Sequence, residues 1–337
     1  MTGVVLFDHV QRRIWSKREE QQIMTRKTLR AASRGRSLVL VATTGVAVMA
    51  AACGSSSSKT TSASTAAPAT TTAPAATSGA STQASGVSVQ LAAEVPAADK
   101  GGITVATNAT YAPDEFFASN NQTITGWDPD LGHAIGKVLG VKFNFVNTSF
   151  ASIIPGLQDG KYTIAMSSAT INPTRLKQID FVSDFNAGEA FFVPAASTLV
   201  VNAFSDLCGK TVAVETGSVE ATDITTANAS CTTKMNIESF TNQSEVNLAL
   251  SSGRADVASA DSPVADYQVA QSAGKFKLSG SILNSAPEGI EFPKGSPLEQ
   301  PILGALKQLI QNGTYQKIMT KYGVASGELL NPQIQTS

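Results

Sequence analysis

The stretch AMSSATINPTR, residues 165–175, decides how the rest of this sequence is best interpreted. A short apolar run leads into it, as expected at the end of a buried strand. Three hydroxyl residues follow, Ser167, Ser168 and Thr170, and then asparagine and proline give the signals of a helix start. Arg175 lies in that first helical turn, so backbone N–H groups, hydroxyls and a guanidinium meet there and predict a carboxylate-binding site. A plain surface turn with an exposed arginine is the alternative.

The chain has 337 residues, of which 42% are hydrophobic, so it is long enough for two or more domains with real cores. Its 25 Lys and Arg nearly balance its 26 Asp and Glu. The basic residues are concentrated before Cys53, and the rest of the chain is acidic. An acidic body predicts no nucleic-acid partner. The sequence contains no P-loop pattern, so we expect no nucleotide site.

The N-terminal part has the pattern of an export signal. A basic segment, residues 26–36, precedes an uncharged apolar run, residues 38–52, which is short for a membrane span. Residues 50–54, AAACG, resemble the lipobox at which a signal peptidase cuts before a lipid-modified cysteine. We therefore expect residues 1–52 to be a signal peptide and Cys53 to carry a lipid anchor on the outer face of the cytoplasmic membrane. The alternative is an ordinary secreted protein with a stray cysteine.

Two further expectations concern the region before the folded body. Residues 1–23 have mixed charge and would make the part of the signal before its apolar run unusually long. We therefore expect translation to start at Met24. Residues 53–98 are rich in Ser, Thr, Ala and Pro and have few large apolar side chains, which predicts a disordered tether. A flexible chain of about 45 residues spans roughly 35 to 40 Å, so the body would stay near the membrane.

Two cysteines, Cys208 and Cys231, lie beyond this tether. An even number of cysteines in an oxidising, exported compartment favours a disulfide, which would close a loop of about twenty residues. No histidine lies nearby and there is no Cys-x-x-Cys motif, so we expect no metal site.

From residue 103 onwards, apolar patterns of strand and helix type alternate, which predicts an α/β fold with largely parallel sheets. The expected strands are 103–107, 142–146, 162–166, 190–193, 211–214, 235–240, 257–260 and 276–278, with a return strand near 287–292. The expected helices are 131–139, 153–158, 219–227, 244–251, 263–271, 298–311 and 315–322.

A series of motifs in this region resembles a known family. Before the opening stretch the chain contains TVATNATYAPDEF (104–116), ITGWDPDLGHAIGKVLG (124–140) and FASIIPGLQDGKYTIAM (150–166). After it come VAVETGS (212–218), RADVASADSPVADY (254–267) and PILGALKQLIQNGTYQKIMTKYG (301–323). In this order and spacing they resemble the extracellular amino-acid-binding proteins of ABC importers, over roughly residues 100 to 325.

The resemblance implies a two-lobed fold of the periplasmic-binding-protein type II class. Each lobe would be a mostly parallel sheet flanked by helices. Lobe I would comprise residues 99–193 and 284–330, and lobe II residues 194–283. Two hinge strands, near residues 190–194 and 284–290, would join them.

A free amino acid carries a carboxylate and an ammonium, and the resemblance implies partners for both. Arg175 and Thr170, with backbone N–H groups around Gly217 and Ser218, would bind the carboxylate. Asp261 would accept from the ammonium, although the N-cap of a helix is its plain alternative role. The full set of expected ligand-binding residues is Asn108, Tyr111, Phe150, Ser167, Ser168, Thr170, Arg175, Glu215, Gly217, Ser218 and Asp261.

The side-chain end of the pocket is less determined. Tyr111 and Phe150 occupy the family's positions for flanking aromatics, although core packing is the alternative for each. Asn108 stands where many members have an aspartate, which argues against an acidic contact from the first lobe. Glu215 stands where neutral or basic residues are common, and it could either favour a cationic ligand or point to solvent.

Binding would shift an open population towards a closed one, which would dock on an ABC permease driven by an ATPase. We expect a monomer without a cofactor. Two rivals share the scaffold. One is an enzyme resembling cyclohexadienyl dehydratase, for which Glu215 is the candidate acid or base. The other is a ligand-sensing module, which would need a separate partner because the sequence shows no appended catalytic or membrane domain.

Overall fold

The computed structural model describes residues 86–336, in which strands and helices alternate as predicted. The strands are β1 (Ile103–Thr107), β2 (Thr110–Tyr111), β3 (Glu115–Phe117), β4 (Ile124–Thr125), β5 (Phe143–Asn147), β6 (Ile164–Thr170), β7 (Ile179–Pro194), β8 (Thr211–Glu215), β9 (Asn236–Phe240), β10 (Val257–Asp261), β11 (Phe276–Leu278), β12 (Leu283–Pro293) and β13 (Ile334–Gln335).

The α-helices are α2 (Val89–Glu94), α3 (Trp127–Leu139), α4 (Ile153–Gln158), α5 (Pro173–Leu176), α6 (Val219–Asn228), α7 (Gln243–Ser251), α8 (Ser262–Gln271), α9 (Glu299–Gln311) and α10 (Thr314–Tyr322). Short 3-10 helices cover Phe150–Ser152, Phe204–Leu207 and Ala325–Gly327.

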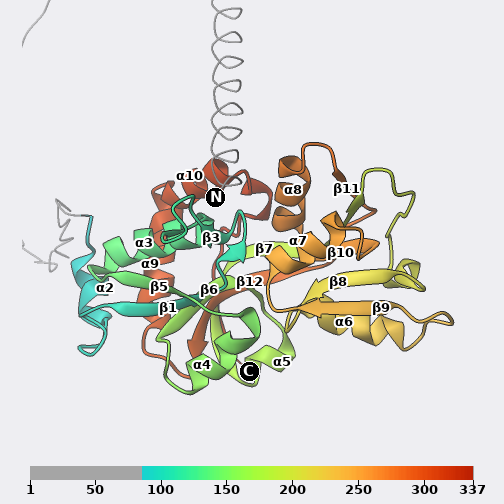
Figure 1. Cartoon of the computed structure of the whole chain (residues 1–337). Coiled ribbons are helices and arrows are strands. Elements are labelled where there is room, and N and C mark those ends of the chain that lie inside the picture. The colour runs from blue at the N-terminus through green and yellow to red at the C-terminus, as the bar shows by residue number, and fades with distance from the viewer. Residues whose placement is uncertain (1–85, 337) are drawn as a thin grey trace, which may run out of the picture. The chain divides into compact units, whose positions relative to one another are not determined.

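One continuous sheet links the two lobes in the order β5-β1-β6-β12-β7-β10-β8-β9, and β11 and β13 also pair with β7. Strand β1 is parallel to β5 and β6 in the first lobe, and β8 is parallel to β9 and β10 in the second. The long strands β7 and β12 pair with each other in antiparallel fashion and connect the two parallel sets (Figure 1). The α/β fold with two joining strands is therefore confirmed.

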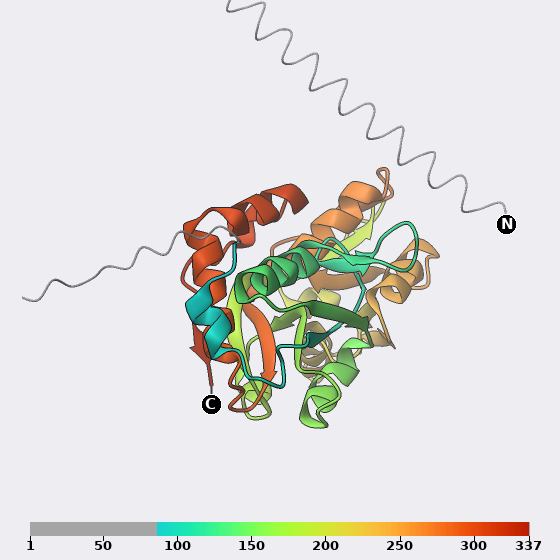
Figure 2. The ribbon, with the colours of Figure 1, turned by 90° about the vertical axis from the view of Figure 1, so that its left-hand side faces the viewer.

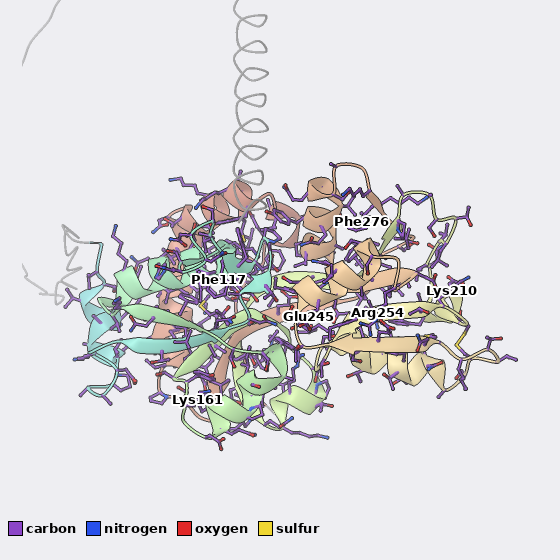
Figure 3. All side chains as sticks on the ribbon, viewed as in Figure 1. Phe117, Lys161, Lys210, Glu245, Arg254 and Phe276 are labelled. Atoms are coloured by element: carbon purple, nitrogen blue, oxygen red, sulfur yellow. A yellow bond between two sulfur atoms is a disulfide. The ribbon has the colours of Figure 1, made fainter. Side chains whose placement is uncertain are left out.

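Helices cover both faces of the sheet in each lobe. In the first lobe α3, α9 and α10 pack on one face, around Trp127 and Phe185, whose rings stack at 4.8 Å, while α4 packs on the other (Figure 1). In the second lobe α7 and α8 pack on one face and α6 on the other. Side chains fill the space between these layers (Figure 3). Each lobe thus buries apolar surface of its own.

The structure joins Cys208 to Cys231 in a disulfide, with their Cα atoms 5.5 Å apart. The bond links the segment before β8 to the end of α6, and both cysteines belong to the apolar cluster of the second lobe. The bridge therefore closes the loop that contains the first turn of α6, which contributes to the site described below.

Several expected elements are longer or begin earlier in the structure. Strand β6 continues to Thr170, so the hydroxyl residues end a strand and do not follow one. Strand β7 starts at Ile179, where only residues 190–193 were predicted. A small antiparallel sheet, β2-β3-β4, was not predicted. It positions Tyr111 and Glu115 beside the cleft.

The prediction of a disordered tether up to residue 98 is wrong for residues 87–98. They include helix α2, which is capped by Ser88 and packs beside α3 and α9 (Figure 2). Val95 is buried in the first lobe's core, and Leu91 contacts Gly304 on α9. Helix α2 was not predicted because its few apolar residues are surrounded by Ala and Ser, as in the segment before it.

Residues 1–85 lie outside the described part, and so do the expected signal peptide, the start at Met24 and the lipid anchor at Cys53. Between residues 86 and 336, no helix is both long and apolar enough to cross a membrane. The exact lobe boundaries at residues 193/194 and 283/284 stay a prediction, and β7 and β12 run across them.

Candidate functional site

Four of the predicted site residues lie at the carboxyl ends of parallel strands. Asn108 follows β1, Thr170 ends β6, Glu215 ends β8 and Asp261 ends β10. In open α/β sheets, ligands bind in the crevice beyond these strand ends. The fold therefore brings residues from four separate parts of the sequence to one place between the lobes.

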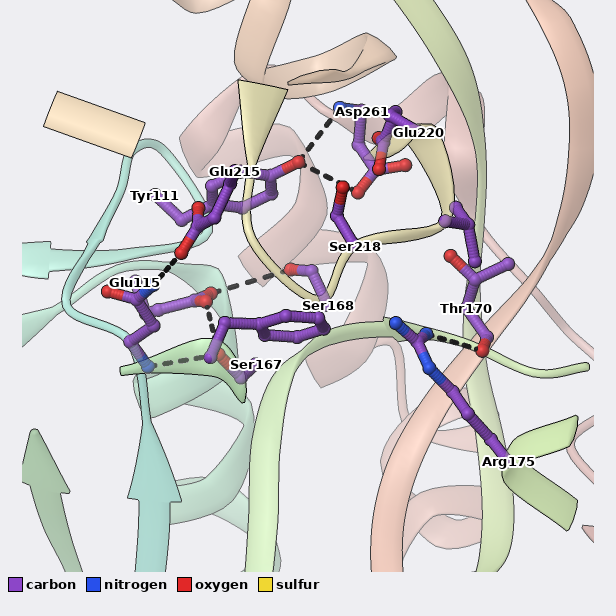
Figure 4. A pocket seen from close by; sticks show the side chains of 13 residues that line it. Tyr111, Glu115, Ser167, Ser168, Thr170, Arg175, Glu215, Ser218, Glu220 and Asp261 are labelled. Atoms are coloured by element: carbon purple, nitrogen blue, oxygen red, sulfur yellow. Dashed lines mark hydrogen bonds between the residues drawn. The ribbon is translucent and has the colours of Figure 1, made fainter. Parts of the chain in front are cut away.

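A cavity lies there, with about 310 Å³ of space not occupied by protein atoms, part of it open to solvent (Figure 4). The residues that line it are Asn108, Tyr111, Glu115, Phe150, Ser167, Ser168, Thr170, Arg175, Glu215, Ser218, Val219, Glu220 and Asp261.

Ten of the eleven predicted site residues are among these lining residues, and the exception is Gly217. Gly217 lies at the cleft all the same, because its carbonyl accepts a hydrogen bond from Arg175 and its Cα faces Ala151 of the first lobe. Three further lining residues were not predicted: Glu115, Val219 and Glu220. The sequence shows only that Glu220 lies two residues after Ser218, a predicted site residue. This spacing does not show whether the Glu220 side chain points into the cleft.

Arg175 is held in place from both lobes. Its helix α5 begins at Asn172, whose side chain accepts hydrogen bonds from the backbone N–H groups of Thr174 and Arg175. Nη1 of Arg175 donates to the carbonyl of Thr170 at 2.7 Å, and Nη2 donates to the carbonyl of Gly217 at 3.3 Å. The guanidinium carbon lies 5.2 Å from the centre of the Phe150 ring. Such a planar, fixed fork matches a carboxylate.

Asp261 holds the N-cap position of α8 but makes no capping hydrogen bond. Its carboxylate instead accepts from the Tyr111 hydroxyl at 2.9 Å, and its backbone N–H donates to the same hydroxyl at 2.8 Å. Burial and the charge of Glu220 raise the pKa of Asp261 well above its usual value. Asp261 thus faces the cleft and lacks a cation of its own.

Glu215 is buried and points into the cleft, so the solvent-facing alternative is wrong. It accepts a hydrogen bond from the side-chain amide of Asn108, which comes from the opposite lobe. The pKa of Glu215 is raised to about 8. Burial and the charge of Glu220 raise it, and the hydrogen bond from Asn108 offsets part of this rise. A nearby cation would favour the ionised form.

The hydroxyls of Ser167 and Ser168 bind other protein groups. Ser167 donates to Glu115 at 2.8 Å and accepts from the backbone N–H of Asn108 at 3.0 Å. Ser168 donates to Asp114 at 2.9 Å. Ser167 therefore positions Glu115, which lines the cavity, and Ser168 holds Asp114 behind it, so only the remaining polar atoms of the two serines are available to a ligand.

More acids lie behind the cavity: Asp114, Asp128, Asp184, Glu288 and Glu291 are all buried. Burial raises the pKa of Asp114 to about 7, that of Asp184 to about 8 and that of Glu291 to about 7. Within residues 86–336, no three of the acidic, histidine or cysteine side chains form a group that could hold a metal ion.

Direct contacts between the lobes surround the cavity. They include the Asn108–Glu215, Tyr111–Asp261 and Arg175–Gly217 hydrogen bonds. At the rim, the rings of Phe116 and Tyr267 lie 6.4 Å apart. The conformation described here is therefore a closed one.

A two-lobed α/β body with a cavity between its lobes, lined mostly by polar side chains, is typical of solute-binding proteins. The family model of bacterial extracellular solute-binding proteins, family 3, matches residues 103–325. The chain belongs to this family.

Known relatives agree. The arginine-binding protein ArgT of Corynebacterium glutamicum is 32% identical over 247 residues, covering 71% of this chain and 81% of the relative. An ancestral arginine-binding protein, solved with bound glutamine, is 36% identical with a TM-score of 0.62, covering 66% of this chain and 98% of that one. An ancestral amino acid-binding protein that is a precursor of cyclohexadienyl dehydratase is 36% identical with a TM-score of 0.60, covering 66% of this chain and 95% of that one. All three are named as binding proteins.

Proposed function

We propose that this chain captures a free basic amino acid, L-arginine before others, and delivers it to the permease of an ABC importer. The observation that carries the proposal is the number of acidic side chains in the cavity, whose ionised forms a bound cation would favour. Four carboxylates line it, from Glu115, Glu215, Glu220 and Asp261, against a single cation, Arg175. Relatives named as arginine-binding proteins support the same ligand class.

The α-carboxylate of the ligand would bind Arg175 and its α-ammonium would bind Asp261, so the two lobes share one zwitterion. Its side chain would then extend between Tyr111 and Phe150 towards Glu215. A neutral side chain would leave the Glu215 carboxyl buried with only an amide partner, whereas a guanidinium would pair with it. A cationic ligand therefore suits this cavity better than a neutral one.

Closure follows from the division of these partners between the lobes. Thr170 and Arg175 belong to the first lobe, and Glu215, Ser218 and Asp261 belong to the second. Only a closed cleft offers all of them at once, so a ligand that contacts both lobes shifts the equilibrium towards closure through β7 and β12. The closed form would be the one that docks on the permease and its ATPase.

Calorimetry on the purified protein tests the ligand class. The titration series is L-arginine, L-lysine, L-ornithine, L-histidine, L-glutamine, L-glutamate, citrulline and putrescine. We expect one site, with L-arginine bound at least tenfold more tightly than citrulline, which has the same shape without the charge. Much tighter binding of glutamine or glutamate than of arginine would refute the proposal.

A dehydratase is the second candidate. The pKa of Glu215, raised to about 8 by burial and by Glu220, is suited to a general acid near neutral pH, and one structural neighbour is a dehydratase precursor. Incubation with prephenate and arogenate discriminates. We expect no product, and release of phenylpyruvate or phenylalanine would make the chain an enzyme.

We infer that the mature protein is monomeric. We also infer that a lipid on Cys53 holds it on the membrane, because residues 50–54, AAACG, resemble a lipobox. Mass spectrometry of the purified mature protein should then show a lipid on an N-terminal Cys53, and an unmodified Cys53 would exclude the anchor. Mass spectrometry of the unprocessed precursor tests the start at Met24, because a peptide from residues 1–23 would contradict it.

A further inference from the structure

Glu220 differs from the other acids that line the cavity. Asp261 accepts from Tyr111, Glu215 accepts from Asn108, and Glu115 accepts from Ser167. Each of these three acids therefore already has a donor from a distant part of the chain. Oε1 of Glu220 is buried and has no hydrogen-bond partner. An unpaired buried carboxylate oxygen is costly, so a group that pairs with it gains correspondingly more.

The backbone explains why Glu220 is fixed in this place. Ser218 caps helix α6, accepting from the N–H of Ala221 at 3.1 Å, and Glu220 lies in the first turn. Its side chain is 2% exposed and reaches the cavity beside Asp261 (Figure 4). The helix N-terminus favours the ionised carboxylate. Burial has the opposite effect and raises the pKa of Glu220, while hydrogen bonds from its own backbone and from Ser218, and then the charge of Arg175, lower it.

The neighbours of Glu220 indicate which part of a ligand it would meet. Among charged groups, Glu220 has the largest effect on Asp261, whose pKa it raises. Two neighbouring carboxylates, one of which raises the proton affinity of the other, form a site for one shared positive group. In the proposed function that group is the α-ammonium of the ligand, which already binds Asp261.

We propose that Glu220 is a specificity-determining residue: together with Asp261 it holds the α-ammonium, so that the protein selects ligands with a free, protonated α-amino group. This inference rests on the proposed function and adds a residue and a selection rule to it. An ammonium has three N–H donors, and the carboxylate oxygens of Asp261 and Glu220 can accept them. Glu215 is left to bind the distal cation.

Two ligands that differ only at the α-position test this assignment by calorimetry. They are L-arginine and 5-guanidinopentanoic acid, which is arginine without its amino group. We expect the unmodified protein to prefer L-arginine strongly. The Glu220→Gln variant keeps the shape and removes the charge, and it should reduce the ratio of the two dissociation constants by about tenfold or more.

Two variants serve as matched controls. Glu215→Gln should weaken both ligands alike and leave their ratio unchanged, because both carry the guanidinium. Glu94→Gln makes the same replacement at an exposed position on α2 and should change neither constant. If Glu220→Gln loses its thermal unfolding transition, Glu220→Ala should give the same fall in the ratio.

The outcomes separate the two proposals. If L-arginine binds the unmodified protein but Glu220→Gln leaves the ratio unchanged, Glu220 does not contact the α-ammonium and the inference is wrong, while the proposed function stands. An equal loss of both ligands would place Glu220 at the guanidinium and would overturn the inference as well. If the unmodified protein binds no basic amino acid, both proposals fail.

Discussion

Arg175 is the residue that we propose as the anchor for the ligand carboxylate. Its guanidinium is fixed by hydrogen bonds to two backbone carbonyls, one from each lobe. Both contacts use donors that a lysine could not present in one plane. The anchor therefore depends on the shape of the guanidinium as well as on its charge.

Arg175→Ala should weaken L-arginine binding by about a hundredfold, because charge-assisted hydrogen bonds contribute roughly 1.5 to 3 kcal/mol each. Arg175→Lys should recover only part of this loss. Calorimetry measures both, with Lys177→Ala as the control at an exposed position on the same segment. Full affinity in Arg175→Ala would mean that the carboxylate binds elsewhere.

The residues that the sequence could not reveal share a physical reason. Glu115 begins the short strand β3 and Glu220 lies in the first turn of helix α6. A charged residue in either place is normally solvated. They are buried here because strand and helix ends from both lobes meet around them. Motif spacing could identify Ser218 and Asp261, but the direction of an unmatched side chain depends on tertiary packing.

At the scale of elements, strand β7 explains the main error of the sequence analysis. Only residues 190–193 were predicted, because Asp180, Asp184 and Glu189 interrupt the apolar pattern before them. All three acids are nevertheless buried in the strand. Apolar periodicity fails where a strand passes under a charged cleft, and this strand is one of the two that join the lobes.

The loop between β8 and α6 should control closure. Gly217 has a φ of 88°, and a Cβ atom there would lie 3.1 Å from Cβ of Ala151 in the other lobe. Gly217→Ala should therefore favour the open form and weaken ligand binding about tenfold. Its thermal midpoint without ligand should change little, since each lobe keeps its own core. Affinity equal to that of the unmodified protein would show that this loop does not limit closure.

The disulfide supports the same region. Replacing both Cys208 and Cys231 by alanine should lower the free energy of unfolding by about 3 kcal/mol, because the bridge restricts a loop with a sequence separation of 23 residues. Urea unfolding of the oxidised protein and of the double variant measures the difference. Identical midpoints and slopes would mean that the bridge contributes nothing to stability.

For the whole molecule, the number of buried acids is the dominant electrostatic feature. Burial raises the pKa of Asp114, Asp184 and Glu291 to about 7 or 8, from values near 4 in an unfolded chain. Between these values the folded protein binds more protons than the unfolded one, so its stability falls as pH rises. The ligand-free protein should therefore be most stable on the acid side of neutrality.

The thermal midpoint without ligand should decrease from pH 5 to pH 8. Each unit of pKa difference corresponds to about 1.4 kcal/mol. Asp184→Asn removes one of these charges and keeps the backbone carbonyl that accepts from Tyr315, so it should flatten the decrease and raise stability at pH 8 by about 2 kcal/mol or more. A midpoint that rises with pH over this range would contradict the assignment.

A crystal structure of the protein with bound L-arginine tests the central claim most directly, namely that the two lobes share one cationic zwitterion. We expect the α-carboxylate on the Arg175 guanidinium, the α-ammonium between Asp261 and Glu220, and the ligand guanidinium within hydrogen-bond distance of Glu215. A ligand that lies outside the cavity, or that contacts only one lobe, would contradict it.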